Sequence, residues 1–195
     1  MRYLAIIIIL ILLPDNSISQ ELEQITTFDS TSHKRIYKIS KSDFQHIVLI
    51  ENLDGTFNGK LVNTIWKVNR KEERTKLIQQ TLKIPPYHVE ELMNIGFINN
   101  IETLSDCEDV DGCVIGLDGT SISFNIRAPE LDRNYWYWEP DNDHYQDSTI
   151  TEIKNVRTIL DEIDKRISLR TLYDSFTSDL PIGKYAYGGI IMTKK

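Results

Sequence analysis

Residues 133–145, RNYWYWEPDNDHY, combine the side chains of this chain that are best suited to binding or catalysis. Four consecutive aromatic residues, 135–138, run into a loop that holds carboxylates and a histidine. Exposed aromatic rings are surfaces on which sugars and protein partners stack. The stretch is therefore either a ligand platform beside a polar site, or a core strand followed by a solvated turn.

Strand geometry divides the four aromatic residues between two faces. Tyr135 and Tyr137 point to one face and the two tryptophans to the other. In the preceding predicted strand, apolar side chains alternate with polar ones, so one face holds Ile122, Phe124 and Ile126 and the other holds Ser121, Ser123 and Asn125. Which aromatic pair is buried then depends on the register between the two strands.

Two registers are open. Phe124 opposite Trp136 buries the indoles, whereas Phe124 opposite Tyr135 buries the phenols and exposes the indoles. A symmetric connection over residues 127–132 favours the second register, and a bulge reverses that. We favour burial of the indoles because they carry more apolar area. The predicted binding surface is then Tyr135, Tyr137, Ser123 and Asn125.

The loop after the aromatic run offers two further kinds of chemistry. Glu139 and Asp141 could act as the paired carboxylates of a glycan hydrolase. Alternate carboxylates also suit hard cations, here at Asp141, Asp143, His144 and Asp147. Pro, Asn and Asp are turn formers, however, and acidic residues favour the N-terminus of a following helix. We assign no metal to residues 139–147.

The acidic loop 106–118 resembles a calcium-binding loop in part. With Gly112 at the obligatory sixth position, Asp109 and Asp111 occupy positions 3 and 5. Position 1 is then Cys107 instead of Asp, and position 12 is Asp118 instead of the bidentate Glu. No cation is assigned here either.

No catalytic motif or cofactor-binding motif is present. His88 and Glu91 share a helix face and could form an acid–base pair, but no nucleophile motif, zinc-binding motif or phosphate-binding loop accompanies them. We therefore assign no catalytic residue and no cofactor. Enzymatic activity stays open and is not the favoured interpretation.

The two cysteines, Cys107 and Cys113, lie in DCEDVDGC. In an exported chain this spacing predicts a disulfide that closes a tight acidic loop. A zinc site would need two more ligands, and catalytic redox pairs are usually CxxC.

The N-terminus predicts export. Arg2 precedes an apolar run over 4–13, and Ser17-Ile18-Ser19 provides small residues at the −3 and −1 positions of a cleavage site. Ten residues rise only about 15 Å as a helix, about half the core of a bilayer. We predict a signal peptide over residues 1–19 and a secreted or periplasmic mature chain, without membrane insertion after cleavage. The chain has no N-glycosylation acceptor, which fits a bacterial protein.

The charge balance argues against two classes of partner. The chain carries 22 basic and 29 acidic residues, a net charge of −7. Nucleic-acid binding and anionic membrane surfaces both require a basic footprint. Nucleic acid is therefore not an expected partner.

The hydrophobic pattern predicts the elements that position these residues. Strands are expected over 34–40, 44–52 and 57–69, then a helix over 70–83 and a second helix over 86–96 that ends at Gly96. Residues 113–127 read as two strands around an Asp118-Gly119 turn, followed by a strand over 133–139.

The C-terminal third predicts the best helix of the chain. Thr149 and Glu152 have capping-box spacing, and an apolar stripe follows at Ile153, Val156, Leu160, Ile163 and Ile167. A short helix over 168–176 and a closing strand over 184–192 complete the pattern. Strands grouped apart from helices predict an α+β fold, with one domain over 20–195 and a mostly antiparallel sheet packed against a few helices.

Two functions remain. The favoured one is a secreted or periplasmic binding protein without enzymatic activity, of the inhibitor or immunity type, whose partner is a protein or a glycan. The alternative is an envelope protein that binds or hydrolyses glycans with Glu139 and Asp141 beside an aromatic platform.

Overall fold

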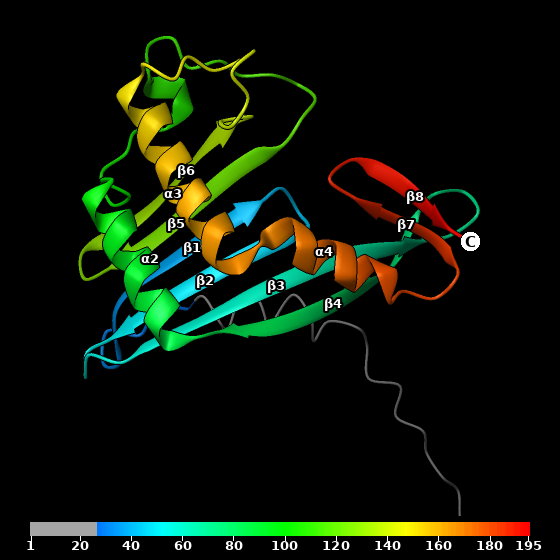
Figure 1. Ribbon diagram of the computed structural model, residues 1–195, viewed down its shortest axis with the longest axis horizontal. Coiled ribbons are helices and arrows are strands. Elements are labelled where there is room, and N and C mark those ends of the chain that lie inside the picture. Colours follow the sequence, from blue (N-terminus) through cyan, green and yellow to red (C-terminus); the bar gives the residue numbers. More distant parts are fainter. Residues whose placement is uncertain (1–26) are drawn as a thin grey trace, which may run out of the picture.

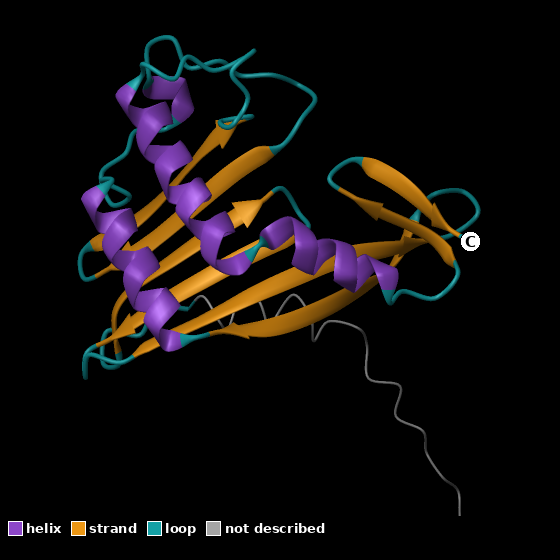
Figure 2. Cartoon of the chain, in the orientation of Figure 1, coloured by secondary structure: helices purple, strands orange, loops and turns teal. Residues whose placement is uncertain are grey.

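An antiparallel sheet of eight strands organises the computed structural model, which describes residues 27–195 (Figure 1). Three helices, α2, α3 and α4, lie on one face of the curled sheet (Figure 2). The α+β prediction is confirmed. The predicted signal peptide, residues 1–19, lies outside the described residues. Among the described helices, none is long and apolar enough to cross a membrane.

The strands follow the order β6-β5-β1-β2-β3-β7-β8, and β4 pairs with β3 as well. Their bounds are β1 His33–Lys41, β2 Gln45–Asn52, β3 Phe57–Val68, β4 Arg74–Ile84, β5 Ser121–Ala128, β6 Leu131–Trp138, β7 Gly183–Tyr187 and β8 Ile190–Lys194. The predicted meander of the first three strands is confirmed, because β1 pairs with β2 and β2 pairs with β3.

The predicted helix over 70–83 is wrong, because this segment forms β4. Its apolar residues have a spacing that fits a helix, but Ile78 lies opposite Ile65 of β3 and Leu82 lies opposite Leu61. Cross-strand pairs of this kind stabilise a sheet, and the long β3 offers a partner along the whole of β4. The tertiary partner therefore outweighs the local helix propensity of Lys, Arg and Gln.

Residues 113–120 form no strand, which corrects the predicted Asp118-Gly119 hairpin. They pack instead beside β6. A Cβ on Gly116 would lie only 2.3 Å from the indole of Trp138, so a side chain there would displace that ring. The hairpin of this region joins β5 to β6 through Pro129 and Glu130, and the φ of Glu130 is +62°.

The helices follow the predicted pattern with two corrections. Helix α2 spans Pro86–Ile98 and continues past Gly96, which packs closely against Tyr37 and Ile101. Helix α3 spans Thr151–Ile167, but its predicted capping box is absent, since Thr149 binds Asp147 instead. Helix α4 spans Leu169–Ser178. The predicted stripe is buried at Ile153, Val156, Leu160 and Ile163.

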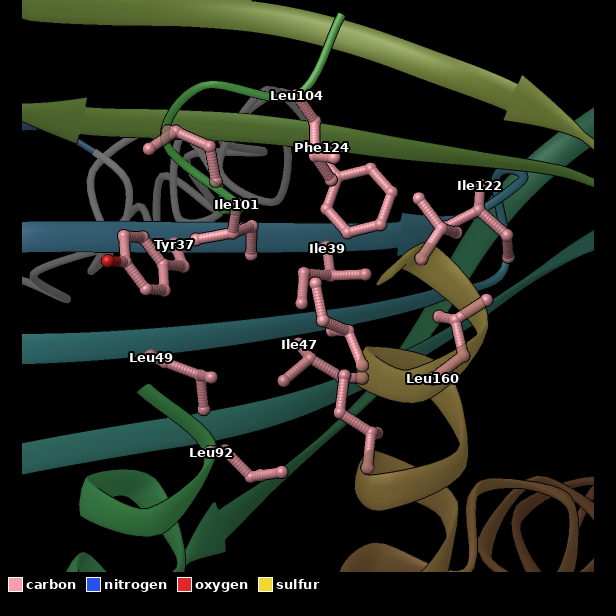
Figure 3. Packing of buried hydrophobic residues seen from close by; sticks show 14 of the residues in the cluster. Tyr37, Ile39, Ile47, Leu49, Leu92, Ile101, Leu104, Ile122, Phe124 and Leu160 are labelled. Atoms are coloured by element: carbon pink, nitrogen blue, oxygen red, sulfur yellow. The ribbon is translucent and has the colours of Figure 1, made fainter. Parts of the chain in front are cut away.

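The main core lies between the sheet and helices α2 and α3. Figure 3 shows side chains of β1, β2 and β5 meeting Leu92 of α2 and Leu160 of α3, with Ile101 and Leu104 closing one end. A smaller cluster joins Ile65 of β3 to α4 and β7. The predicted closing strand is a hairpin, because Gly188 and Gly189 adopt positive φ values of +50° and +78° between β7 and β8.

Candidate functional site

The β5–β6 hairpin has the register that places Phe124 opposite Tyr135. Our favoured register, with Phe124 opposite Trp136, is wrong. The two-residue turn makes Ala128 and Leu131 the closing pair, and the ladder then continues without a bulge. Tyr135 is 3% exposed and Tyr137 is 0% exposed, so the tyrosines belong to the core and not to a binding surface.

The phenols are buried because their hydroxyl groups find acceptors. Tyr135 Oη donates to the carbonyl of Ile101, at 2.5 Å, and Tyr137 Oη donates to the carbonyl of Ser105. A buried tyrosine needs such a partner. Burial raises the pKa of both phenols well above the usual value of 10, so both stay neutral.

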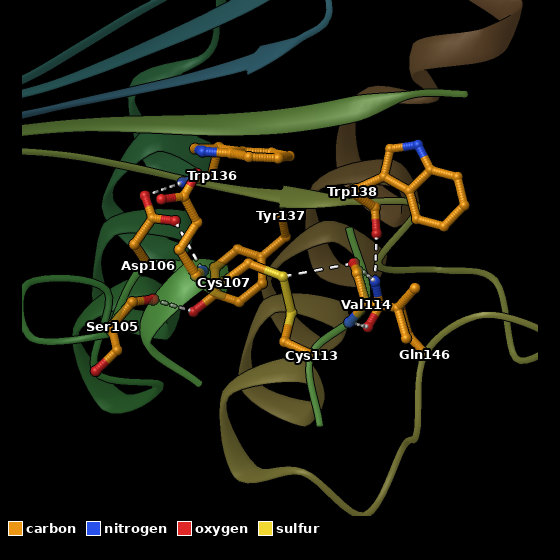
Figure 4. The surroundings of a disulfide bond; sticks show 10 residues. Ser105, Asp106, Cys107, Cys113, Val114, Trp136, Tyr137, Trp138 and Gln146 are labelled. Atoms are coloured by element: carbon orange, nitrogen blue, oxygen red, sulfur yellow. Dashed lines mark hydrogen bonds between the residues drawn. A yellow bond between two sulfur atoms is a disulfide. The ribbon is translucent and has the colours of Figure 1, made fainter. Parts of the chain in front are cut away.

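These acceptors belong to residues 101–114, which we call the edge segment because they run along β6. Arg133 donates to the carbonyls of Glu102 and Leu104, at 2.7 and 2.6 Å. Asp106 accepts from the backbone N–H of Trp136 at 3.2 Å, which occupies an outward-facing donor of β6 (Figure 4). The edge segment therefore covers an edge of the sheet that would otherwise be open.

The predicted disulfide between Cys107 and Cys113 is confirmed, with an S–S distance of 1.99 Å. It closes the turn of the edge segment. Beside it, Gln146 is 1% exposed and its Nε2 donates to the carbonyls of Val114 and Trp138, at 2.7 and 2.6 Å (Figure 4). Sequence reasoning missed Gln146, since a lone glutamine in a polar loop carries no pattern.

The outer face of β5 and β6 points away from the helices and carries Trp136. Figure 4 shows its indole on the side of β6 opposite to Tyr137. Ser123 lies across from Trp136, and Asn125 lies across from Asn134. These side chains line a hollow of about 670 Å³, which Lys38 and Asp106 also border. We call Trp136, Ser123, Asn125 and Asn134 the Trp136 face.

Two of the predicted surface residues, Ser123 and Asn125, thus lie on an accessible face. The aromatic residue beside them is Trp136, and not Tyr135 or Tyr137 as predicted. Trp138 is not part of it, because it is 7% exposed and its Nε1 donates to the carbonyl of Asp118 at 2.8 Å. Asn125 Nδ2 donates to Asn134 Oδ1. Asn125 Oδ1 is buried and has no hydrogen-bond partner among the described residues. An unpaired buried acceptor is costly unless a ligand donates to it.

The structure does not bring Glu139 and Asp141 into one hollow. Glu139 Oε1 accepts from the backbone N–H of Thr120, the residue before β5. Asp141 lines a separate pocket of about 340 Å³ with Lys41 and Asp161. Desolvation raises the pKa of Asp141, and nearby Lys41 opposes that rise.

The other acidic side chains of the loops have structural partners. Asp143 forms an ion pair with Arg157 at 2.5 Å, and Asp147 accepts from Thr149. His144 donates its backbone N–H to Asn142. Within residues 27–195, no group of three or more His, Cys, Asp or Glu side chains is arranged to hold a metal ion, in either acidic loop.

His88 and Glu91 lie together on α2, with 3.5 Å between His88 Nδ1 and the Glu91 carboxylate. Glu91 also accepts from Arg166 of α3 at 2.9 Å. Hydrogen bonds from Arg166, and secondarily from His88, lower the pKa of Glu91. The carboxylate therefore links two helices at the surface.

The predicted site residues that line a hollow do so at two places in the described chain: the Trp136 face, and the pocket beside Asp141. The first combines an indole with hydrogen-bonding groups, whereas the second holds the desolvated carboxylate of Asp141 beside Lys41 and Asp161 and does not include Glu139. No protein-family model matches the chain, and no curated protein matches its sequence.

Proposed function

We propose that the chain is an exported, non-enzymatic binding protein that recognises a protein partner through its Trp136 face. The observation that carries the proposal is the position of Trp136, between hydrogen-bonding side chains on a sheet face that none of the described helices covers. Tryptophan is enriched among the residues that dominate protein interfaces, because its ring offers a large and rigid contact area.

The groups around the indole suit a polypeptide backbone. Asn125 and Asn134 together offer amide donors and acceptors, and the unpaired Asn125 Oδ1 needs a donor such as a backbone N–H. Ser123 adds a hydroxyl that can donate or accept.

The face is also held rigid before binding. Its strands pair without a bulge, and the edge segment holds β6 through Arg133 and Asp106. A preorganised surface loses less conformational entropy on association. An interface with a small buried area can therefore bind its partner with measurable affinity.

Export is supported by two independent features. Residues 1–19 have the pattern of a signal peptide, and the Cys107–Cys113 disulfide is of the kind that persists in oxidising compartments. We propose a secreted or periplasmic location on these grounds.

Glycan binding is the second candidate. An indole next to two amides can stack on a sugar ring and hydrogen-bond its hydroxyl groups. Glycan hydrolysis has weaker support, because it requires paired carboxylates about 5 to 10 Å apart in one groove. Glu139 is bound to Thr120 and does not line the pocket of Asp141.

Site-specific cross-linking tests the proposal. A photo-reactive residue replaces Asn134 on the Trp136 face or, as the control, Lys154 on the exposed side of α3. Extracts of the native organism should give a discrete polypeptide adduct with the first protein only. Trp136→Ala should abolish the adduct with little change in the thermal melt, whereas Trp66→Ala, a tryptophan on β3 far from the hollow, should retain it.

Two outcomes contradict the proposal. Undiminished capture by a folded Trp136→Ala variant removes the Trp136 face as the binding surface. An adduct that glycosidases cleave and proteases leave intact assigns the face to a glycan.

A further inference from the structure

The edge formed by β4 differs from the edge formed by β6, because nothing among the described residues covers it. β4 pairs with β3 on one side along Arg74–Ile84 and has no strand on the other side. In an antiparallel ladder, alternate residues of an end strand direct their N–H and C=O groups outward. An eleven-residue strand therefore offers a long row of backbone donors and acceptors.

A groove runs beside this edge. Its volume is about 780 Å³, and it is lined by residues 76–81 of β4 and by the chain that leads from α4 into β7. Figure 1 shows α4 and β7 near the Arg74 end of β4, so one wall of the groove is a strand edge and the other a helix end.

The floor of the groove is apolar. Ile78 faces the helical side of the sheet and packs against the small core of Phe176, Leu180 and Tyr185. Tyr185 Oη donates to the carbonyl of Pro181 at 2.7 Å, which fixes the far wall. A single apolar side chain of a bound strand would contact this floor.

The rim of the groove is basic. Lys67 and Lys76 lie opposite each other on the face that carries Ile78, and neither has an ion-pair partner among the described residues. β4 contains Arg74, Lys76 and Lys83 and no acidic residue, in a chain whose net charge is −7. Asp179 is the acidic residue that lines the groove.

We propose that the β4 edge is a second interaction surface, which binds an extended acidic segment of a partner protein by strand addition. Main-chain hydrogen bonds to β4 supply affinity and the groove supplies specificity. The register of β4 sets the motif: an acidic residue beside Lys76, an apolar residue two positions along over Ile78, and a polar residue two further along beside Gln80.

A second copy of this chain fits the edge poorly. Pairing β4 with itself would bring two basic strands together, and like charges placed opposite each other destabilise a sheet. Lysines on an end strand also have a simpler role, which is to prevent non-specific aggregation. That role alone predicts no preference for acidic peptides.

Fluorescence anisotropy separates these roles. The probe is a labelled peptide, Gly-Thr-Glu-Thr-Val-Thr-Gln-Gly, and its partner probe carries Lys in place of Glu. The oxidised protein should bind the Glu peptide about tenfold more tightly than the Lys peptide. K76E should reverse the preference, whereas K154E, on the exposed side of α3, should leave it unchanged.

Amide hydrogen exchange locates the binding. The Glu peptide should protect residues 74–84, and W136A should bind it as the unmodified protein does, which separates this surface from the Trp136 face. Equal affinity for both peptides, no binding of either below about 1 mM, or protection away from β4 overturns the proposal.

Discussion

The two long end strands of the sheet, β6 and β4, differ in whether another part of the described chain covers their outer edge. At β6 the edge segment covers the strand, and phenol, guanidinium and carboxylate groups link the two. At β4 the strand faces the solvent with basic side chains and a groove beside it. An uncovered edge is a template for pairing with another chain, so the chain prevents pairing at one edge and leaves it available at the other.

The difference also separates two kinds of binding surface. The covered edge holds the strands of the Trp136 face rigid, whereas the open edge offers backbone groups that are completed only by a partner.

Tyr137→Ala should remove about 3–5 kcal/mol of the free energy of unfolding, because it leaves a cavity in the core and an unpaired carbonyl at Ser105. Trp136→Ala, its neighbour on the outer face, should cost about 1 kcal/mol. Urea denaturation of the oxidised proteins measures both. The reverse order would show that the hairpin has the other register.

Alkaline pH should weaken the covered edge through its tyrosines. Burial raises the folded-state pKa of Tyr135 and Tyr137 above the ordinary value of 10. Their stabilisation is therefore complete below pH 10 and is lost as the pH rises above it, because only the unfolded chain ionises. The two together should remove about 3 kcal/mol by about pH 11.

Denaturation at neutral and alkaline pH measures this loss. Between neutral pH and about pH 11, the Tyr135→Phe/Tyr137→Phe double variant should lose about 3 kcal/mol less of its free energy of unfolding than the unmodified chain loses. Tyr87→Phe, a change at an exposed tyrosine, should lose as much as the unmodified chain does. Identical pH profiles for all three proteins would contradict the burial of the phenols.

Removal of the disulfide should loosen the covered edge alone. The double variant Cys107→Ala/Cys113→Ala should lose about 2 kcal/mol, since the cross-link closes a short loop. Amide exchange should accelerate in the edge segment and β6, relative to β4. Uniform acceleration across the sheet would mean that the disulfide supports the whole fold.

Asp106→Ala should have the smallest effect that is still measurable, about 1 kcal/mol, because the backbone N–H groups of Trp136 and Glu108 lose their acceptor. Two matched changes, Asp109→Ala in the same loop and Lys76→Gln at the open edge, should each stay within about 0.5 kcal/mol. Differential thermal melts measure all three. A larger loss from Lys76→Gln would show that the open edge is stabilised within the chain.

β4 shows why the spacing of apolar residues does not always distinguish a helix from a strand. Leu77, Ile78 and Leu82 fit a helical spacing, and the surrounding Lys, Arg and Gln are good helix formers. In a strand, Ile78 and Leu82 share one face and Leu77 lies on the other, so the choice between helix and strand depends on whether a partner strand is available. β3 is that partner, and its length was not recognisable from the residues of β4.

The two faces of β6 show that the sequence pattern also does not decide which side of a strand is buried. Strand alternation separates the two pairs, but which pair is buried depends on the turn at Pro129 and Glu130 and on distant acceptors. The carbonyls of Ile101 and Ser105 accept from the phenols across more than thirty positions of sequence. Apolar area alone favoured the indoles, and hydrogen bonding to the edge segment reversed that preference.

By itself, the sequence determined the features that depend on neighbouring residues: the α+β class, the meander, the stripe of α3 and the short-range disulfide. The tertiary structure alone decided that β4 is a strand with an open edge, and that Trp136 instead of the tyrosines lies on the outer face. The first decision rests on pairing with the neighbouring strand β3, and the second on carbonyl acceptors more than thirty positions away. The periodicity within a single segment contains no information about either partner.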